Sequence, residues 1–216
     1  MLIDILCTDP NHPVVPRLRA WIAACSDDIA ARLIHDRSEL TRGNILFLVS
    51  CSQVIARDDR DRYDHVMVLH ASDLPKGRGW SPLVWDILAG EEELTVSLLT
   101  AEDGVDTGAI WAKQRFRVPK HALHDEINSR LFDAELGLMD TGIKMVSSGE
   151  RPTPQREGGS SYHQRRRPED SRLDPTRPLS ELFDQIRVAD PDRYPAFFDL
   201  HGKTFEVTIR KRKTRE

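Results

Sequence analysis

Short apolar runs alternate with stretches of helical periodicity along the first two thirds of the chain. Apolar runs of about four to eight residues bounded by turn residues are typical of buried strands. Such strands are predicted at Leu2–Cys7, Ala31–Ile34, Ile45–Val49, Val66–Leu69, Leu94–Thr100 and Ala109–Arg117. Apolar positions at helical spacing predict helices over Val14–Cys25 and His121–Val146. This alternation predicts an α/β fold with a mostly parallel sheet flanked by helices, and ligands beyond the carboxyl ends of the strands.

A polar tract rich in Gly, Pro and Ser interrupts this pattern at residues 147–159. Such composition is typical of a connecting segment. We therefore expect a catalytic domain at residues 1–150 and a small C-terminal extension at residues 151–216. Within the extension, Leu179–Val188 is amphipathic and Thr204–Ile209 alternates like a strand before a charged tail.

The composition is that of an ordinary soluble protein. The chain has 216 residues, 39% hydrophobic and 31% charged, which is long enough to bury a core without disulfides or metal. Its formal net charge of -4 gives no general attraction to nucleic acid. The chain opens directly on the first predicted strand and has no run of about 20 apolar residues, so we expect a cytoplasmic protein without a membrane partner. Three separated cysteines without a CxxC pair predict no metal site.

The candidate chemistry begins with a histidine at the end of a predicted strand. Val66–Leu69 delivers His70 directly to a loop that contains one proline and two glycines. A second predicted strand leads to an acidic loop that holds Asp106. Taken alone, the histidine is more often structural, and the aspartate fits an ordinary Asx turn. Together they form a plausible acid/base pair, in which the carboxylate holds the imidazole and favours its protonated form.

These two stretches resemble the folate-dependent formyltransferases, which include the methionyl-tRNA and the nucleotide-sugar N-formyltransferases. The family carries Asn-x-His before a Ser-Leu-Leu-Pro-x-x-Arg-Gly loop, and later an Asp-Thr-Gly or Asp-Ala-Gly loop. The matching text is Val68-Leu-His70-Ala-Ser72-Asp-Leu-Pro75-Lys-Gly-Arg78-Gly79 and Val105-Asp106-Thr107-Gly108. The likeness covers residues 46–111 and implies a Rossmann-like formyltransferase fold, reduced at its start, that uses N10-formyltetrahydrofolate as formyl donor.

The resemblance also implies roles for individual residues. His70 would deprotonate the acceptor amine or carry its proton, and Asp106 would orient His70. The formyl donor would be held by three loops and one aromatic side chain: Gln53, Val54, Ile55, Ser72, Asp73, Leu74, Pro75, Trp80, Glu102, Asp103, Gly104 and Val105. For Trp80, a role as a packing anchor is equally open.

One position departs from the family pattern. The asparagine expected two residues before the histidine is Val68 here. In the family that asparagine donates a hydrogen bond to the developing oxyanion, and losing such a donor typically costs about 10²–10³ in rate. Ser50, Ser52 or a backbone N–H of residues 71–73 could replace it. A catalytically silent binder of folate or of a sugar nucleotide is therefore an alternative.

The C-terminal residues bear on the acceptor. The segment from Arg187 through Arg193 and Tyr194 resembles an element near the nucleotide-sugar site of the sugar N-formyltransferases, and these three residues with Arg78 are candidate substrate contacts. Guanidinium groups match phosphate oxygens in a bidentate way. The residues after Gly159 are too few for the barrel domain of the methionyl-tRNA enzymes.

We therefore expect the acceptor to be the amine of a nucleotide-linked amino sugar for surface-glycan (lipopolysaccharide) biosynthesis. No nucleic-acid partner is expected, and a homodimer is left open. Methionyl-tRNA or another amine is the first alternative. A generic nucleotide-binding Rossmann module is disfavoured, because no GxGxxG follows the first predicted strand.

Overall fold

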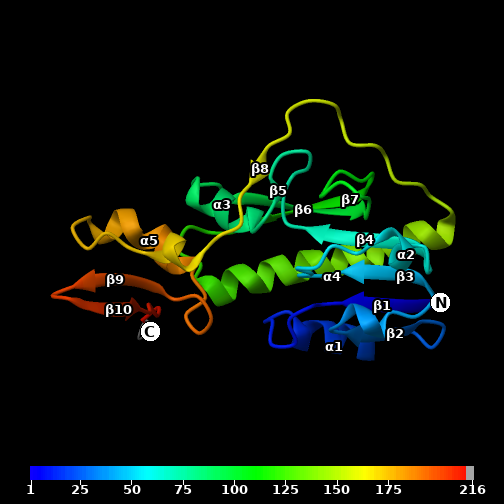
Figure 1. Ribbon diagram of the computed structural model, residues 1–216, viewed down its shortest axis with the longest axis horizontal. Coiled ribbons are helices and arrows are strands. Elements are labelled where there is room, and N and C mark those ends of the chain that lie inside the picture. The colour runs from blue at the N-terminus through cyan, green and yellow to red at the C-terminus, as the bar shows by residue number, and fades with distance from the viewer. Residues whose placement is uncertain (213–216) are drawn as a thin grey trace.

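A six-stranded sheet forms the centre of the chain, which a computed structural model describes over residues 1–212 (Figure 1). The strands lie in the order β2-β1-β3-β4-β6-β7. They are β1 (Leu2–Leu6), β2 (Ala30–Ile34), β3 (Gly43–Leu48), β4 (Tyr63–His70), β6 (Glu93–Thr100) and β7 (Ile110–Arg117). The first four pair in parallel, whereas β6 is antiparallel to β4 and β7 is antiparallel to β6. The α/β fold with a mostly parallel sheet is thus confirmed, with an antiparallel edge.

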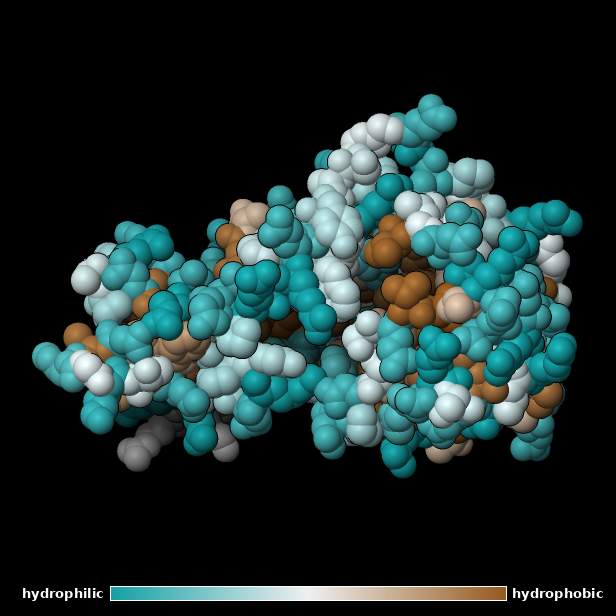
Figure 2. Space-filling view, in the orientation of Figure 1, coloured by the Kyte–Doolittle hydropathy of each residue, from teal (hydrophilic) through white to brown (hydrophobic). Residues whose placement is uncertain are grey.

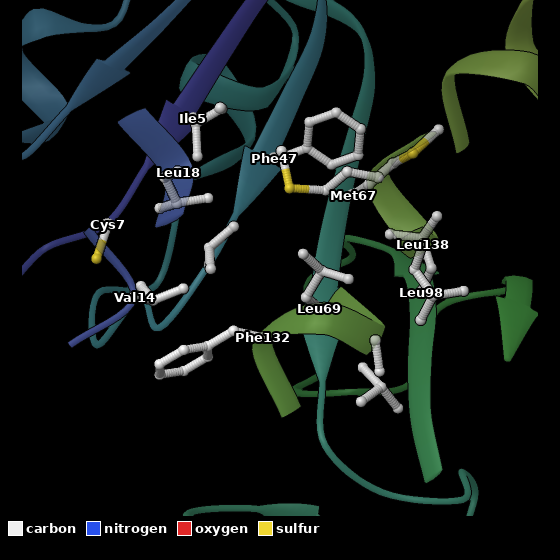
Figure 3. Close-up of a cluster of buried hydrophobic side chains, with 14 of the residues drawn as sticks. Ile5, Cys7, Val14, Leu18, Phe47, Met67, Leu69, Leu98, Phe132 and Leu138 are labelled. Carbon is white, nitrogen blue, oxygen red and sulfur yellow. The ribbon is translucent and has the colours of Figure 1, made fainter. Parts of the chain in front are cut away.

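Two helices cover one face of the sheet, α1 (Val15–Ala23) and the long α4 (His124–Ser148). Figure 3 shows how Phe47, Met67 and Leu69 of the sheet meet Leu138 and other α4 side chains in the main core. These sheet residues occur at every second position along β3 and β4, as strand geometry requires of one face. Burial of this alternating set against the helices anchors β4, and therefore His70 at its end.

The other face of the sheet is covered by irregular segments and the short helix α2 (Arg57–Arg60). Leu46, Leu48 and Val66 form its core with Ile55, which follows β3. A second short helix, α3 (Pro82–Leu88), packs instead with Leu94 of β6 and Ile127 of α4. The loops that cover this face carry polar backbone groups, which can contribute to a binding site.

The segment that follows α4 passes back over the sheet before it reaches the C-terminal residues. Residues 149–168, named here the strap, arch over the sheet and return past the loop that follows β4 (Figure 1). In the strap, β8 (Tyr162–His163) pairs in parallel with β5 (Arg78–Gly79). The expected division at residue 150 stays a prediction, but the structure ties the start of the extension to the loop after His70.

Beyond the strap, α5 (Leu179–Arg187) and the hairpin of β9 (Ala196–Leu200) and β10 (Lys203–Val207) form a lobe with its own small core. Figure 1 places this lobe beyond the carboxyl ends of β1, β3 and β4. The last residues of the expected extension, 213–216, lie outside the described residues. Within residues 1–212, no helix is long and apolar enough to cross a membrane.

Candidate active site

The antiparallel direction of β6 changes how Asp106 reaches the site. Because β4 and β6 are antiparallel, their carboxyl ends lie at opposite ends of the strands. An all-parallel sheet would have placed the two ends side by side. Thr100, the last residue of β6, pairs with Met67 in the middle of β4. The loop of residues 101–109 therefore starts over the middle of the sheet and brings Asp106 back to His70.

His70 is buried between two loops. Its Nε2 lies 2.8 Å from the carbonyl oxygen of Gly77, and its Nδ1 lies 3.6 Å from Oδ1 of Asp106. The side chains of His70 and Asp106 are 8% and 10% exposed, so water screens their interaction little. Because a carbonyl oxygen can only accept, Nε2 carries the proton in this contact. A proton on Nδ1 as well would make the imidazolium that faces the Asp106 carboxylate.

Asp106 adopts a left-handed backbone conformation, with φ of 54°. Its Oδ2 accepts a hydrogen bond of 2.8 Å from the backbone N–H of Gly79, so the loop after β4 holds the same carboxylate that faces His70. Gly108 allows the loop to close, because a Cβ there would lie 1.9 Å from the carbonyl oxygen of Thr100. The Asp-Thr-Gly sequence thus places a strained aspartate next to a glycine that no other residue can replace without backbone movement.

The expected donor residues after His70 are mostly buried. Ser72 and Leu74 are 1% and 2% exposed, and the carbonyl of Ser72 accepts a hydrogen bond of 2.7 Å from Ser97. The hydroxyl of Ser72 is buried without a hydrogen-bond partner among the described residues. Asp73 forms an ion pair of 2.6 Å with Lys113 of β7, which ties this loop to the sheet edge. Of the four side chains, those of Asp73 and Pro75 are accessible to a ligand, and Asp73 is paired with Lys113.

The two other expected donor segments lie together on the loop-covered face. Ile55 is a core residue, whereas Val54 is 71% exposed and Val105 is 50% exposed. An ion pair between Arg60 and Asp103 joins the two segments. Figure 2 shows apolar surface over the region of β4 and α2, beneath the arch of the strap. The exposed apolar side chains give this region a surface suited to an aromatic ligand.

Trp80 is partly buried, and the guanidinium of Arg165 lies 4.6 Å from the centre of its ring. The ring of Trp85 on α3 stacks on His163 of the strap at 6.0 Å. Both contacts fasten the strap to the loop after β4. The contact of the Trp80 ring with Arg165 fits a packing role for this residue, and its role in binding the donor stays a prediction.

The strap contributes residues that the sequence interpretation missed. The side chain of Gln155 reaches the backbone of the Asp106 loop, and Ser161 accepts a hydrogen bond of 2.9 Å from the N–H of Gly77. Both lie in or beside the polar tract that was interpreted as a connecting segment. The one sequence signal for an ordered backbone in this tract is its pair of adjacent glycines, Gly158 and Gly159, which both have positive φ.

The four candidate acceptor contacts separate into three places. Arg187 is 2% exposed, is paired with Asp184 and donates to the carbonyl of Ala122. The amphipathic helix buries this position, and the phosphate contact expected from the likeness to the sugar enzymes stays a prediction. Arg78 lies in the His70 site, where it bonds the side chain of Gln155.

Arg193 and Tyr194 line a cleft of about 780 Å³ between the C-terminal lobe and the sheet. Its other walls come from the β1–α1 loop and the first turns of α4, including Asp9 and Phe132. Arg193 is paired with Asp9 and lies 5.4 Å from the centre of the Tyr194 ring, and Tyr194 is 57% exposed. The hollow is visible in Figure 2 beside the C-terminal lobe.

Val68 lies two residues before His70 on β4 and therefore on the same face of the sheet. It is half-buried against the core that contains Leu48 and Ile55. Of the suggested replacement donors, the hydroxyl of Ser52 is hydrogen-bonded to that of Thr8, and the Ser72 N–H is bound to the carbonyl of His70. The Ser72 hydroxyl, in the same loop, is buried and unpaired within residues 1–212. Across the same range, no cluster of three or more His, Cys, Asp or Glu is arranged to hold a metal ion.

Comparison with known proteins agrees with this geometry. The family model described as "Formyl transferase" matches residues 30–142, just over half of the 216-residue chain. The chain belongs to the formyl transferase family. The match contains β4, the loop after it, β6 and the Asp106 loop, so the resemblance expected from the two sequence motifs is confirmed.

Individual relatives carry different acceptor names. The chain is 28% identical over 200 residues to a methionyl-tRNA formyltransferase of Sorangium cellulosum, covering 92% of this chain and 59% of that protein. It is similar in structure to the methionyl-tRNA formyltransferase of Clostridium thermocellum, with a TM-score of 0.84, 25% identity and coverage of 99% and 94% of the two chains. A sugar N-formyltransferase of Shewanella sp. has the same fold, with a TM-score of 0.75, 14% identity and coverage of 100% and 99%.

The chain thus spans about three fifths of the length of the curated relative that it matches. The fold expected from the family, an α/β formyltransferase fold, is shown by these likenesses. The acceptor is not fixed by them, because relatives with either kind of acceptor in their names share the fold.

Proposed function

We propose that the protein transfers a formyl group from N10-formyltetrahydrofolate to a primary amine. The observation that carries this proposal is the buried pair of His70 and Asp106, held 3.6 Å apart by the loop after β4. A buried imidazole that a carboxylate orients is suited to act as a general acid or base.

In the proposed reaction the acceptor nitrogen attacks the formyl carbon and forms a tetrahedral intermediate. The bond between the formyl carbon and N10 then breaks, which releases tetrahydrofolate and the formylated amine. The acceptor nitrogen loses a proton and N10 gains one, and His70 would carry that transfer. Because Nδ1 faces Asp106, His70 would exchange a proton with substrate through Nε2 once that atom leaves the carbonyl of Gly77.

The donor is proposed to lie on the loop-covered face beneath the strap. Val54 and Val105 offer exposed apolar surface there, which fits the flat aromatic ring system of a folate. Residues 102–105 form an exposed loop whose peptide groups could bond the polar edges of such a ring, apart from the Gly104 carbonyl, which accepts from Thr107. Family membership supports the same donor, since the resemblance of both motifs is to folate-dependent enzymes.

For the acceptor we propose the amine of a nucleotide-linked amino sugar. The cleft lined by Arg193 and Tyr194 has a volume of about 780 Å³, within the range of small-molecule sites. It opens beside the end of β1, which is separated from β4 by β3. Strands lie about 4.8 Å apart, so this cleft is about 10 Å from the end of β4. A nucleotide in the cleft could therefore present its sugar amine near His70.

Methionyl-tRNA is the second candidate acceptor, favoured by the names of the relatives from Sorangium and Clostridium. The net charge of -4 argues against it, because binding to nucleic acid draws most of its affinity from neutralised phosphates. A third reading, a silent binder of folate or sugar nucleotide, follows from Val68.

The test is formyl transfer from N10-formyltetrahydrofolate to a panel of nucleotide-linked amino sugars and to methionyl-tRNA, detected by the mass of the product. His70→Ala serves as the inactive control. Transfer to a sugar alone supports the whole proposal, whereas transfer to methionyl-tRNA alone refutes the acceptor and keeps the reaction. Folate binding without transfer to any acceptor refutes the reaction and supports the silent binder.

A further inference from the structure

The side chain of Gln155 connects three segments that are far apart in the sequence. Its Nε2 lies 2.8 Å from the carbonyl oxygen of Asp106 and 2.9 Å from that of Gly108, and its Oε1 lies 2.7 Å from Nη2 of Arg78. The two carbonyls can only accept and the guanidinium can only donate, so the orientation of the amide is fixed by its partners. Both N–H groups of the amide and one lone pair of its oxygen are used in these contacts.

The contacts of Gln155 are made to the residue that faces His70. Asp106 has a φ of 54°, a conformation that a residue with a side chain rarely adopts and that surrounding contacts must hold. Gly79 holds the Asp106 carboxylate from one side, and Gln155 holds its carbonyl from the other. Arg78, the third partner, precedes Gly79 directly in the loop after β4. Gln155 therefore joins both loops that place Asp106.

We propose that Gln155 is a positioning residue, which acts through Asp106 and sets the distance and angle between that carboxylate and the imidazole of His70. This inference rests on the proposed formyl transfer. Gln155 is not expected to touch the reacting atoms, since its polar atoms are bound to Asp106, Gly108 and Arg78. Without its amide, the carbonyls of Asp106 and Gly108 each lose a donor, and Asp106 is free to leave the left-handed conformation.

Two substitutions separate the two ends of the side chain. Gln155→Glu has nearly the same size and keeps an oxygen for Arg78, but it replaces the donor to the Asp106 and Gly108 carbonyls by an acceptor. Gln155→Ala removes both ends. Gln164→Ala is the matched control, because Gln164 lies on the same strap, is exposed, and makes no side-chain hydrogen bond within residues 1–212.

We expect kcat to fall by about 10²-fold in both Gln155 variants, since a misplacement near 1 Å in a catalytic site has an effect of this size. The KM for the folate donor should stay near its wild-type value, because the contact acts on the reaction step. A general loss of structure would instead raise the KM as well as lower kcat.

A second measurement does not depend on turnover. In protein labelled at the histidine ring carbons, the NMR signal of His70 is assigned by its loss in His70→Gln and recorded at one fixed pH. Its chemical shift should change in both Gln155 variants, because the ring lies in a different position relative to Asp106, and stay in place in Gln164→Ala. If wild-type protein forms no product with any acceptor, the proposed reaction fails while this measurement still tests Gln155. An unchanged His70 chemical shift in both Gln155 variants, with unchanged kcat where turnover exists, would overturn the inference.

Discussion

The carboxyl group of Glu135 should make the stability of this fold depend on pH. Glu135 lies on α4, is 5% exposed, and its Oε2 has no hydrogen-bond partner among the described residues. Burial raises its pKa from 4.5 to about 8. Near neutral pH the folded chain therefore keeps a proton that the unfolded chain releases, because a buried unpaired carboxylate is too costly.

The magnitude follows from the two pKa values. Because the pKa of Glu135 is raised on folding, its contribution is fully present below pH 4.5, decreases as the pH rises, and is lost above about pH 8. Each pH unit in this window lowers the free energy of unfolding by about 1.4 kcal/mol. The loss amounts to about 3 kcal/mol at pH 7 and about 5 kcal/mol above pH 8. This is a large share of the stability of an ordinary domain.

Substitution of Glu135 by Gln tests this reasoning. Glutamine has nearly the same shape and does not ionise, so any cost of its unpaired amide is the same at each pH. Urea unfolding of wild type and Glu135→Gln at several values from pH 5 to pH 8 gives the difference in the free energy of unfolding. From pH 5 to pH 8, the free energy of unfolding of the variant should rise relative to that of wild type by about 3–4 kcal/mol.

The matched control is Glu206→Gln, which changes an exposed glutamate that makes no ion pair within residues 1–212. Its stability should follow the wild-type pH dependence. Parallel curves for wild type and Glu135→Gln would refute the reasoning, because they would mean that Glu135 is ionised in the folded protein or paired with a group that satisfies it.

Three further predictions concern the site. Asp106→Asn keeps an acceptor for the Gly79 N–H but removes the charge beside His70, so kcat should fall by about 10²–10⁴-fold with an unchanged circular dichroism spectrum. Wild-type turnover in that variant would exclude the acid/base role. Val68→Asn places an amide on the face that carries His70, and kcat should rise by up to about 10²-fold if the oxyanion lacks a donor. An unchanged kcat would show that another donor already serves it. Gly108→Ala forces a Cβ to within 1.9 Å of the Thr100 carbonyl, and should lower stability by about 1–3 kcal/mol in thermal unfolding together with activity. Full stability in Gly108→Ala would show that the turn can open without cost.

Most regular elements could be predicted from sequence because their cores are periodic. The strands predicted at Leu2–Cys7 and Leu94–Thr100 match β1 and β6 within a residue, and the helix predicted over His121–Val146 matches α4 within three. The helices α2 and α3 were missed because they have too few residues for a helical period to develop. The direction of β6 could not be predicted from the hydrophobic pattern either, because a buried run of apolar residues occurs in both parallel and antiparallel strands.

The site was predicted in part, and the part that was missed has a single physical cause. His70 and Asp106 were found through side chains in recognisable motifs, whereas what holds them together is mostly backbone: the carbonyls of Gly77, Asp106 and Gly108 and the N–H of Gly79. Backbone groups are the same at every position, so no sequence pattern reveals which of them face one another. Gln155 and Ser161 add side chains to this set, and they lie in or beside a tract polar enough to be interpreted as a connecting segment. The distance between His70 and Asp106 is therefore set by the strap as well as by the two motifs, and motif matches alone do not establish that a chain of this family is active.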